Sequence, residues 1–170
     1  MSRTYFSSDW HLGHKNILRW RSQFKSIEEH DNHIILNHQK VLTKRDILVV
    51  CGDVAFTQES LARLDEIQCA KKVLILGNHC TEGRGDITME DLLVMFDEVH
   101  AMKKGSYQKV GFWITHCPMH PSELRGKPFN IHGHTHLATI DDPRYINVCL
   151  EHTNYEPVWV EDLLKQRKAL

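Results

Sequence analysis

The run of residues 130–136, Asn-Ile-His-Gly-His-Thr-His, constrains this chain more than any other stretch, because it carries a histidine at every second position. If the run forms a strand or the frayed end of one, His132, His134 and His136 point to one face. Gly133 removes a side chain where another part of the chain approaches the backbone closely. Neutral imidazoles clustered in this way are typical ligands of a transition metal. A polar surface strand is the alternative; a cloning tag is disfavoured because the run is internal and interrupted by Gly and Thr.

The composition is that of a soluble globular protein, since 41% of the 170 residues are hydrophobic and 25% are charged. This length suits a sizeable core, and we expect one domain over residues 1–170. A net charge of −1 supplies no global basic field, which disfavours a dedicated nucleic-acid binder but allows a local basic rim.

The chain shows no sign of a secretory or membrane destination. Residues 1–9 lack the pattern of a signal peptide, and no apolar run approaches the length that spans a membrane. The five cysteines are an odd number without the spacing of a disulfide framework. We therefore expect reduced thiols in a cytoplasmic protein that has no membrane partner.

The first half of the chain alternates predicted strands and helices. Residues 4–8, 46–51 and 71–76 are predicted strands, and the last two are continuous apolar runs typical of buried parallel strands. Helices are predicted over residues 27–42, after Thr57, and over residues 89–96. The order strand, helix, strand is a βαβ signature and indicates the α/β class.

The predicted helix over residues 27–42 begins at a capping box, Ser26-Ile27-Glu28-Glu29. It carries His30, His33 and His38, which we interpret as solvated or edge residues without a role as ligands.

The second half is predicted to contain mainly strands. Consecutive strands joined by Gly-containing turns are expected at residues 99–102, 108–110 and 112–115. Later strands are expected at residues 129–131, 145–149 and 157–160, before a closing helix over residues 161–168. No linker or repeat marks a domain boundary.

Polar residues follow five of these strands, where each could reach the same rim of a sheet. They are Asp9, His11, Asp53, Asn78, His79, His116, His134 and His136. Two Asp, one Asn and four His are too many donors for one ion, and they suit two ions that share a carboxylate. Such a donor set favours Mn, Fe, Zn, Co or Ni over Ca or an oxygen-ligated Mg.

These blocks resemble the pattern of the calcineurin-like metallophosphoesterases, which reads D-x-H, G-D, G-N-H-D/E, H, G-H-x-H. The chain has the five blocks in that order: Asp9-Trp10-His11, Gly52-Asp53, Gly77-Asn78-His79, His116 and Gly133-His134-Thr135-His136. Residues 9–17 and 154–157 further resemble the small single-domain bacterial and phage-type phosphoesterases.

The resemblance implies a fold of two mixed β-sheets packed face to face with helices outside, a four-layer α/β/β/α sandwich. It implies two divalent metal ions, with Mn the favoured ion in vitro, and hydroxide attack on phosphorus. The first ion would be held by Asp9, His11 and His136, the second by Asn78, His116 and His134, and Asp53 would bridge them. His79 would face the phosphate as acid or charge stabiliser.

Two positions depart from the family pattern. Cys80 stands where the family usually has an acidic residue. Phe56 stands where the phosphoprotein-phosphatase branch has an Asp that orients the catalytic His. The chain therefore matches that branch poorly, and the sequence does not indicate what orients His79.

Several residues near these blocks are candidates for weaker roles. His14, Arg84 and His120 are candidates for substrate binding. The alternatives are support of His11 or plain packing for His14, solvation for Arg84 and a place outside the pocket for His120. His132 is expected in a supporting or surface position rather than as a ligand. Cys80 and Cys117 are interpreted as small buried hydrophobes, with a redox role as the alternative.

The expected function is hydrolysis of a phosphodiester or phosphomonoester of modest size, with a nucleotide as one candidate substrate. A nuclease is the first rival, because a small basic and aromatic groove could be built from Lys15, Arg19, Arg21, Trp10 and Trp20. The second is a catalytically silent protein-binding scaffold, which is disfavoured because His79 and all the ligand candidates are present.

Overall fold

Four parallel strands form the frame of a five-stranded sheet in the computed structural model, which describes residues 2–80 and 86–168. The strand order is β4-β3-β2-β1-β9, and β9 at the edge runs antiparallel to β1. The strands are β1 (Thr4–Ser7), β2 (Ile47–Val50), β3 (Lys71–Ile75), β4 (Glu98–His100) and β9 (Val158–Trp159). Because β1 to β4 are parallel, their carboxyl ends lie along one edge of the sheet.

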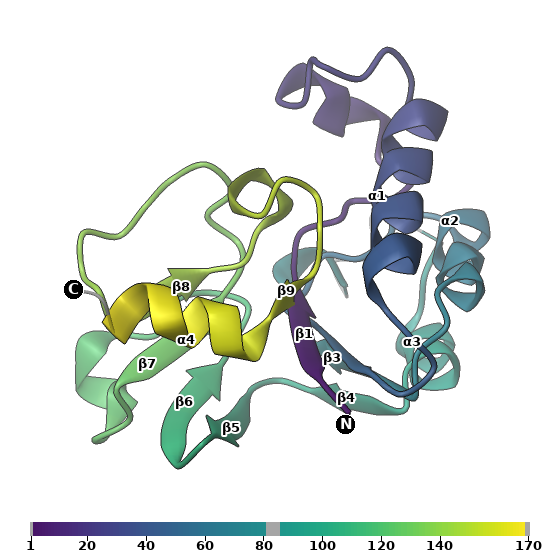
Figure 1. The fold of residues 1–170 in the computed structure, drawn as a ribbon. Helices are drawn as coiled ribbons and strands as arrows, with labels where there is room; N and C mark the ends of the chain where they lie inside the picture. The colour runs from purple at the N-terminus through teal and green to yellow at the C-terminus, as the bar shows by residue number, and fades with distance from the viewer. Residues whose placement is uncertain (1, 81–85, 169–170) are drawn as a thin grey trace.

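A second sheet has the strand order β5-β6-β7-β8. It contains β5 (Lys103–Tyr107), β6 (Val110–Ile114), β7 (Phe129–His132) and β8 (Tyr145–Asn147). Strands β6, β7 and β8 are parallel, whereas β5 is antiparallel to β6. The prediction of two mixed sheets with helices is thus confirmed (Figure 1).

The core between the two sheets is built from alternate residues of each strand. Phe6, Val49 and Val73 of the first sheet pack with Phe112 and Ile131 of the second. Helix α4 (Val160–Lys168) adds Val160, Leu163 and Leu164 to the same core. Alternation along a strand sends neighbouring side chains to opposite faces, so β1, β2 and β3 also supply a second core.

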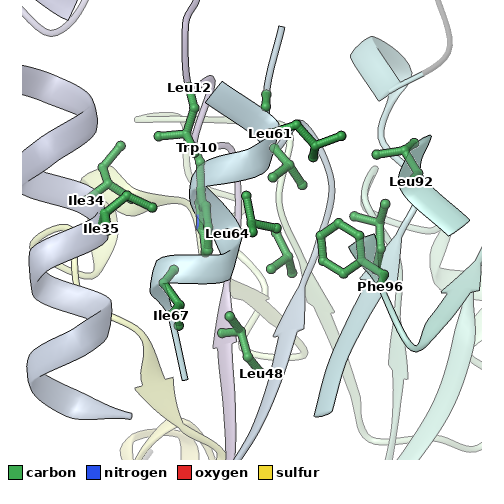
Figure 2. Close-up of a cluster of buried hydrophobic side chains, with 14 of the residues drawn as sticks. Trp10, Leu12, Ile34, Ile35, Leu48, Leu61, Leu64, Ile67, Leu92 and Phe96 are labelled. Atoms are coloured by element: carbon green, nitrogen blue, oxygen red, sulfur yellow. The ribbon is translucent and has the colours of Figure 1, made fainter. Parts of the chain in front are cut away.

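The second core lies between the first sheet and the helices that cover its other face, α1 (Ile27–Val41), α2 (Gln58–Ala62) and α3 (Met89–Met95). Figure 2 shows Ile34 and Ile35 of α1 beside Trp10, and the side chains of Leu61, Leu64 and Ile67 close by. Leu64 belongs to the 3-10 helix η2 (Arg63–Glu66), which continues α2. The predicted apolar face of residues 57–67 is confirmed, although the α-helix itself is short.

Short 3-10 helices lie in the connections: η1 (Lys15–Arg19), η3 (Asn78–Cys80), η4 (Pro121–Leu124) and η5 (Leu150–His152). Within the described part of the chain, no helix combines the length and apolar character needed to cross a membrane.

The start of α1 matches the predicted capping box only in part. The Ser26 side chain accepts a hydrogen bond from the Glu29 backbone N–H, as predicted. The Glu29 carboxylate accepts from the Lys25 backbone N–H rather than from Ser26. At α2, Thr57 and Ser60 make both bonds of the motif.

The strand predicted over residues 108–110 is wrong. Gln108 and Lys109 form a turn with φ of 48° and 69°, and the strand before it is β5. Gly105, which suggested a turn, lies inside β5 because the Phe112 ring occupies the space that a Cβ would need. The glycine reflects close packing rather than a change of chain direction.

The interpretation of His30 and His38 as solvated residues is also wrong, since both are fully buried; His33 is exposed as expected. The Nδ1–H of His38 donates to the Ile34 carbonyl (2.8 Å) and its Nε2 lies 3.1 Å from the Ser7 hydroxyl. That hydroxyl accepts from the Trp10 indole (2.7 Å) and donates to the His38 ring. Neutral His38 therefore satisfies its polar atoms inside the core, as buried polar groups require.

Burial lowers the pKa of His38 to about 4, and the bond to the Ile34 carbonyl opposes this shift. An unfolded histidine has a pKa of about 6.5, so the unfolded state takes up a proton first as the pH falls. The free energy of unfolding should fall between pH 6.5 and 4, with His38 contributing up to about 1.4 kcal/mol per pH unit. Chemical denaturation of the His38→Gln variant should show a shallower dependence on pH in this window.

His33→Gln, an exposed change on the same helix, is the matched control and should keep the slope of the parent protein. Equal slopes for the parent protein and His38→Gln would show that His38 is not held neutral in the fold.

Candidate metal centre

The predicted ligands lie where the carboxyl ends of strands from both sheets meet. Asp9 and His11 follow β1, Asp53 follows β2, and Asn78 begins η3 after β3. From the second sheet, His116 follows β6, and the segment carrying His134 and His136 follows β7. A parallel bridge between Ser8 and Cys149 joins the two groups of strand ends.

The three alternating histidines do not share one strand face, so that part of the prediction is wrong. Strand β7 ends at His132, which is buried, and its Nδ1–H donates to the Gly133 carbonyl (2.9 Å). His134 and His136 lie beyond the strand with φ of 69° and 45°. The histidine at every second position therefore lies in a loop with left-handed residues, not along an extended strand.

A left-handed backbone is common among the predicted ligands. Five of the seven have positive φ: Asp9 (58°), His11 (53°), Asp53 (52°), His134 and His136. For a residue with a Cβ this conformation costs roughly 1–2 kcal/mol, and such residues cluster where function over-determines the backbone. Each strand end is thus turned sharply so that its side chain faces the common rim.

The first cluster consists of Asp9, His11 and His136. The Asp9 Oδ1 atom lies 3.8 Å from His11 Nε2 and 3.7 Å from His136 Nε2. Asp9 Oδ1 and both ring nitrogens of His11 are buried without a hydrogen-bond partner. Buried polar atoms are normally satisfied, so this cluster has the unmet coordination expected of a metal site.

The second cluster consists of Asn78, His116 and His134. His116 Nε2 lies 2.9 Å from Asn78 Oδ1 and 3.2 Å from His134 Nδ1. The other nitrogen of His116, Nδ1, donates to the Cys51 carbonyl (2.7 Å), which leaves Nε2 as an electron-pair donor in the neutral ring. Cis ligands of a metal bound at about 2.1 Å are separated by about 3 Å, so these spacings fit one ion.

Asp53 stands between the two clusters. Its Oδ2 atom lies 3.9 Å from His11 Nε2 and 3.3 Å from His116 Nε2. Its Oδ1 atom accepts the backbone N–H of His79 (2.9 Å). One carboxylate oxygen therefore faces donors of both clusters, and the other is held in place.

The charges of the site favour a cation. Burial opposes ionisation of Asp9, but the nearby rings of His11 and His116 and the hydrogen bond from the Ser8 hydroxyl hold the pKa of its carboxyl well below the ordinary value. Burial likewise opposes ionisation of Asp53, and His116 lowers the pKa of that carboxyl. The same Asp53 carboxylate raises the pKa of His116 against the effect of burial. The buried carboxylates of Asp9 and Asp53 therefore need a nearby positive charge, which a proton or a metal ion can supply.

Glu151 and Arg21 belong to the site although the sequence analysis assigned neither to it. The Nδ1–H of His136 donates to Glu151 Oε1 (2.9 Å), which leaves His136 Nε2 facing Asp9. Arg21 is fully buried and donates to Glu151 Oε1 (2.9 Å) and to the backbone carbonyls of Asp9 (2.6 Å) and Trp10 (3.1 Å). Despite burial, the His136 bond and the Arg21 charge lower the pKa of Glu151 to about 2.

Two of the residues considered for a nucleic-acid groove are not at the surface. Arg21 and Trp10 are buried, whereas Trp20 is exposed. No local sequence signal could have revealed this, because Arg21 and Glu151 are separated by 130 positions.

Phe56 packs among three histidine rings. Its ring is stacked on His14 with a centroid distance of 4.1 Å, and it lies 5.5 Å from His11 and 5.4 Å from His79. Burial, with smaller contributions from His11 and His79, lowers the pKa of His14 to about 4, so this ring is neutral at pH 7. The structure thus brings His14 and His79 to the first cluster from two segments.

The other candidates lie elsewhere. His120 is exposed, and its ring accepts from the Ser122 backbone N–H at the start of η4. Arg84 lies outside the described residues. Cys80 is buried as expected, but Cys117 is exposed, and its Sγ belongs to a group of possible ligand atoms with His116 and His134. All five cysteines are free, as the odd count indicated.

Comparison with known proteins gives relatives that match most of the chain. The uncharacterized protein MJ1445 of Methanocaldococcus jannaschii is 27% identical over 97% of this chain and 91% of its own length. The Gene 66 protein of Mycobacterium phage L5 is 30% identical over 67% of this chain and 49% of its own length. Among solved structures, the protein of unknown function AQ665 from Aquifex aeolicus superposes with a TM-score of 0.80 at 25% identity, covering 98% of this chain and all of that one.

The model of the calcineurin-like phosphoesterase family matches residues 2–169. That match takes in every block of strand-end residues from Asp9 to His136. The chain therefore belongs to the calcineurin-like phosphoesterase family.

Proposed function

We propose that this protein is a phosphoesterase that uses two divalent metal ions to hydrolyse a phosphodiester or a phosphomonoester. The observation that carries the proposal is the position of Asp53 Oδ2, within 3.9 Å of His11 Nε2 and 3.3 Å of His116 Nε2. A single carboxylate oxygen between two donor clusters suits a pair of metal ions that share a ligand.

In this proposal Asp9, His11 and His136 hold one ion and Asn78, His116 and His134 hold the other. The nitrogen-rich donor set favours Mn, Fe, Zn, Co or Ni. When bound, the ions would supply a hydroxide at neutral pH and neutralise charge on the phosphate oxygens. We further propose that residues 1–170 act as one domain and that the protein works in the cytoplasm.

Within this proposal His79 is the acid. Its backbone N–H is fixed by Asp53 Oδ1 (2.9 Å), and its ring centroid lies 5.6 Å from that of His11 and 5.4 Å from that of Phe56. In this proposal the His79 imidazole faces the phosphate and donates a proton to the leaving oxygen. Such a proton transfer is worth roughly 10²–10⁴ in rate.

The rival functions receive less support from the geometry. A nuclease groove would need stacking and basic side chains, yet Trp10 and Arg21 are buried. A silent scaffold has no need of Asp9 Oδ1 and His11 nitrogens that are buried without partners. The deciding experiment is a screen of the purified, Mn²⁺-loaded protein against aryl monoesters, aryl diesters, cyclic nucleotides and short oligonucleotides. Turnover of none of them would refute the proposal.

Asp53→Asn should lower the metal content and nearly abolish hydrolysis, because the change removes a charged ligand from both ions at constant shape. Elemental analysis and turnover of an aryl diester measure the two effects. Asp65→Asn, an exposed change in η2, is the control and should retain both ions. Two tightly held ions in Asp53→Asn would sink the bridging role.

Glu151→Gln should weaken metal binding about 10–100-fold, the usual effect of losing the carboxylate behind a ligand histidine. The reason is that Glu151 holds His136 Nδ1–H and so presents Nε2 to the first cluster. Competition with a chromophoric chelator measures the affinity, and denaturation separates it from any loss of stability caused by an unpaired Arg21. The exposed change Glu156→Gln is the control, and equal affinities would contradict the role of Glu151.

His79→Gln should keep the fold and both ions but lose at least about a hundredfold in turnover, as expected for a missing acid. The loss should be smaller for a nitrophenyl ester than for an ester of a poorer leaving group, which needs the proton more. Loss of metal from this variant would instead make His79 a ligand. Full activity towards a poor leaving group would exclude it as the acid.

A further inference from the structure

A cavity of about 510 Å³ opens directly beside the first cluster. Its lining includes the candidate site residues His11, His79 and His136, and also the apolar side chains of Ile17, Trp20 and Leu137. Among the described residues, none of those that line it is a lysine or an arginine. The cavity therefore continues the proposed metal centre into an apolar space of the size that ligand pockets have.

Two of the large hydrophobic side chains that the fold leaves exposed border this one cavity. Trp20 is 68% exposed and Leu137 is 69% exposed, although they come from distant parts of the chain. Large apolar side chains that gather in the open at a cavity, instead of packing in the core, are typical of binding sites.

The backbone that carries Trp20 is fixed on both sides. The Trp20 backbone N–H donates to the Ile17 carbonyl (3.0 Å), and Ile17 is buried. The next residue, Arg21, is locked by Glu151 and by the Asp9 carbonyl. The indole is thus presented on a rigid support, which reduces the entropy lost when a ligand stacks on it.

The backbone that carries Leu137 is held in the same way. The Asn147 side chain donates to Thr135 Oγ1 (2.8 Å) and to the carbonyls of His136 (3.1 Å) and Ala138 (3.3 Å). These bonds bracket Leu137 and fix its backbone. The backbones that carry both apolar side chains are therefore preformed at the cavity.

We propose that this cavity is the subsite for the organic group of the ester, and that it selects a planar aromatic or heteroaromatic ring. The inference rests on the proposed function, because a phosphate at the two clusters directs one ester substituent past His11, His79 and His136 into the cavity. The ring stacks on Trp20 and contacts Leu137 and Ile17. A saturated ring of equal size buries similar area but lacks the stacking contact.

The test uses two non-hydrolysable ligands of matched charge and size, phenylphosphonate and cyclohexylphosphonate, titrated by calorimetry into the Mn²⁺-loaded protein. Phenylphosphonate should bind about tenfold more tightly, the effect of one stacked ring. In Trp20→Ala this ratio should fall to about 1, whereas Trp20→Phe should retain most of it. Because both ligands carry the phosphonate, the ratio of their affinities for one variant is free of any effect of the substitution on phosphonate binding itself.

Leu93→Ala, an exposed leucine of α3 away from the cavity, is the control and should keep the ratio of the parent protein. A ratio near 1 in the parent protein, or an unchanged ratio in Trp20→Ala, would overturn the subsite. This test measures binding, so failure of the subsite proposal would appear in the affinity ratio. Failure of the proposed function would appear separately, as no turnover of any ester in the screen.

Discussion

The Asp9 carboxylate holds the two sheets together at the point where all the chemistry converges. Its Oδ2 atom accepts from the Ser8 hydroxyl (2.5 Å), the His134 backbone N–H (2.9 Å) and the Cys149 thiol (3.1 Å). Those donors belong to strand ends of both sheets. Gly133 permits this approach, because a Cβ there would collide with Ser8 Oγ and Asp9 Oδ2. Because Oδ2 accepts these three hydrogen bonds, Oδ1 is the oxygen that faces His11 and His136. The hydrogen bonds that join the sheets therefore also orient Asp9 Oδ1 as a metal ligand.

The strained strand ends follow from that convergence. A side chain at the end of an extended strand points above or below the sheet, not along the strand axis. The left-handed turns at Asp9, His11 and Asp53 redirect these side chains towards the rim. Their cost is offset by neighbouring bonds, such as the donation of the His11 backbone N–H to the Asp53 carbonyl (2.9 Å). The parallel strands behind them, buried on both faces, supply the rigidity that keeps the turns in place.

The strand ends were predictable from the sequence because each apolar run stops at a polar residue, and that local signal places Asp53 and Asn78 correctly on one rim. What could not be predicted depends on contacts between distant residues. His38 is buried because Ser7, 31 positions away, completes its hydrogen bonds, and Glu151 supports His136 from beyond β8. Gly105 was misleading for a similar reason, since its partner is the Phe112 ring across the sheet. Periodicity records the polarity of a residue but not whether the fold provides it with a partner.

The charge balance of the site links Phe56 to the proposed chemistry. Burial comes first among the causes that lower the pKa of His11 and of His134, as it does for His14, whose ring is stacked on Phe56. These rings are therefore neutral at pH 7. The pKa values of His116 and His136 are raised beside Asp53 and Glu151, and both rings must be deprotonated to bind a metal, so Asp9 and Asp53 supply the charge of the two metal-loaded clusters. Two divalent ions would leave the centre with two positive charges, which suits one hydroxide and one phosphodiester anion. An aspartate at position 56 would lower the net positive charge of the centre by one, beside His79. The Phe56 ring leaves this net charge unchanged and orders the histidines by packing.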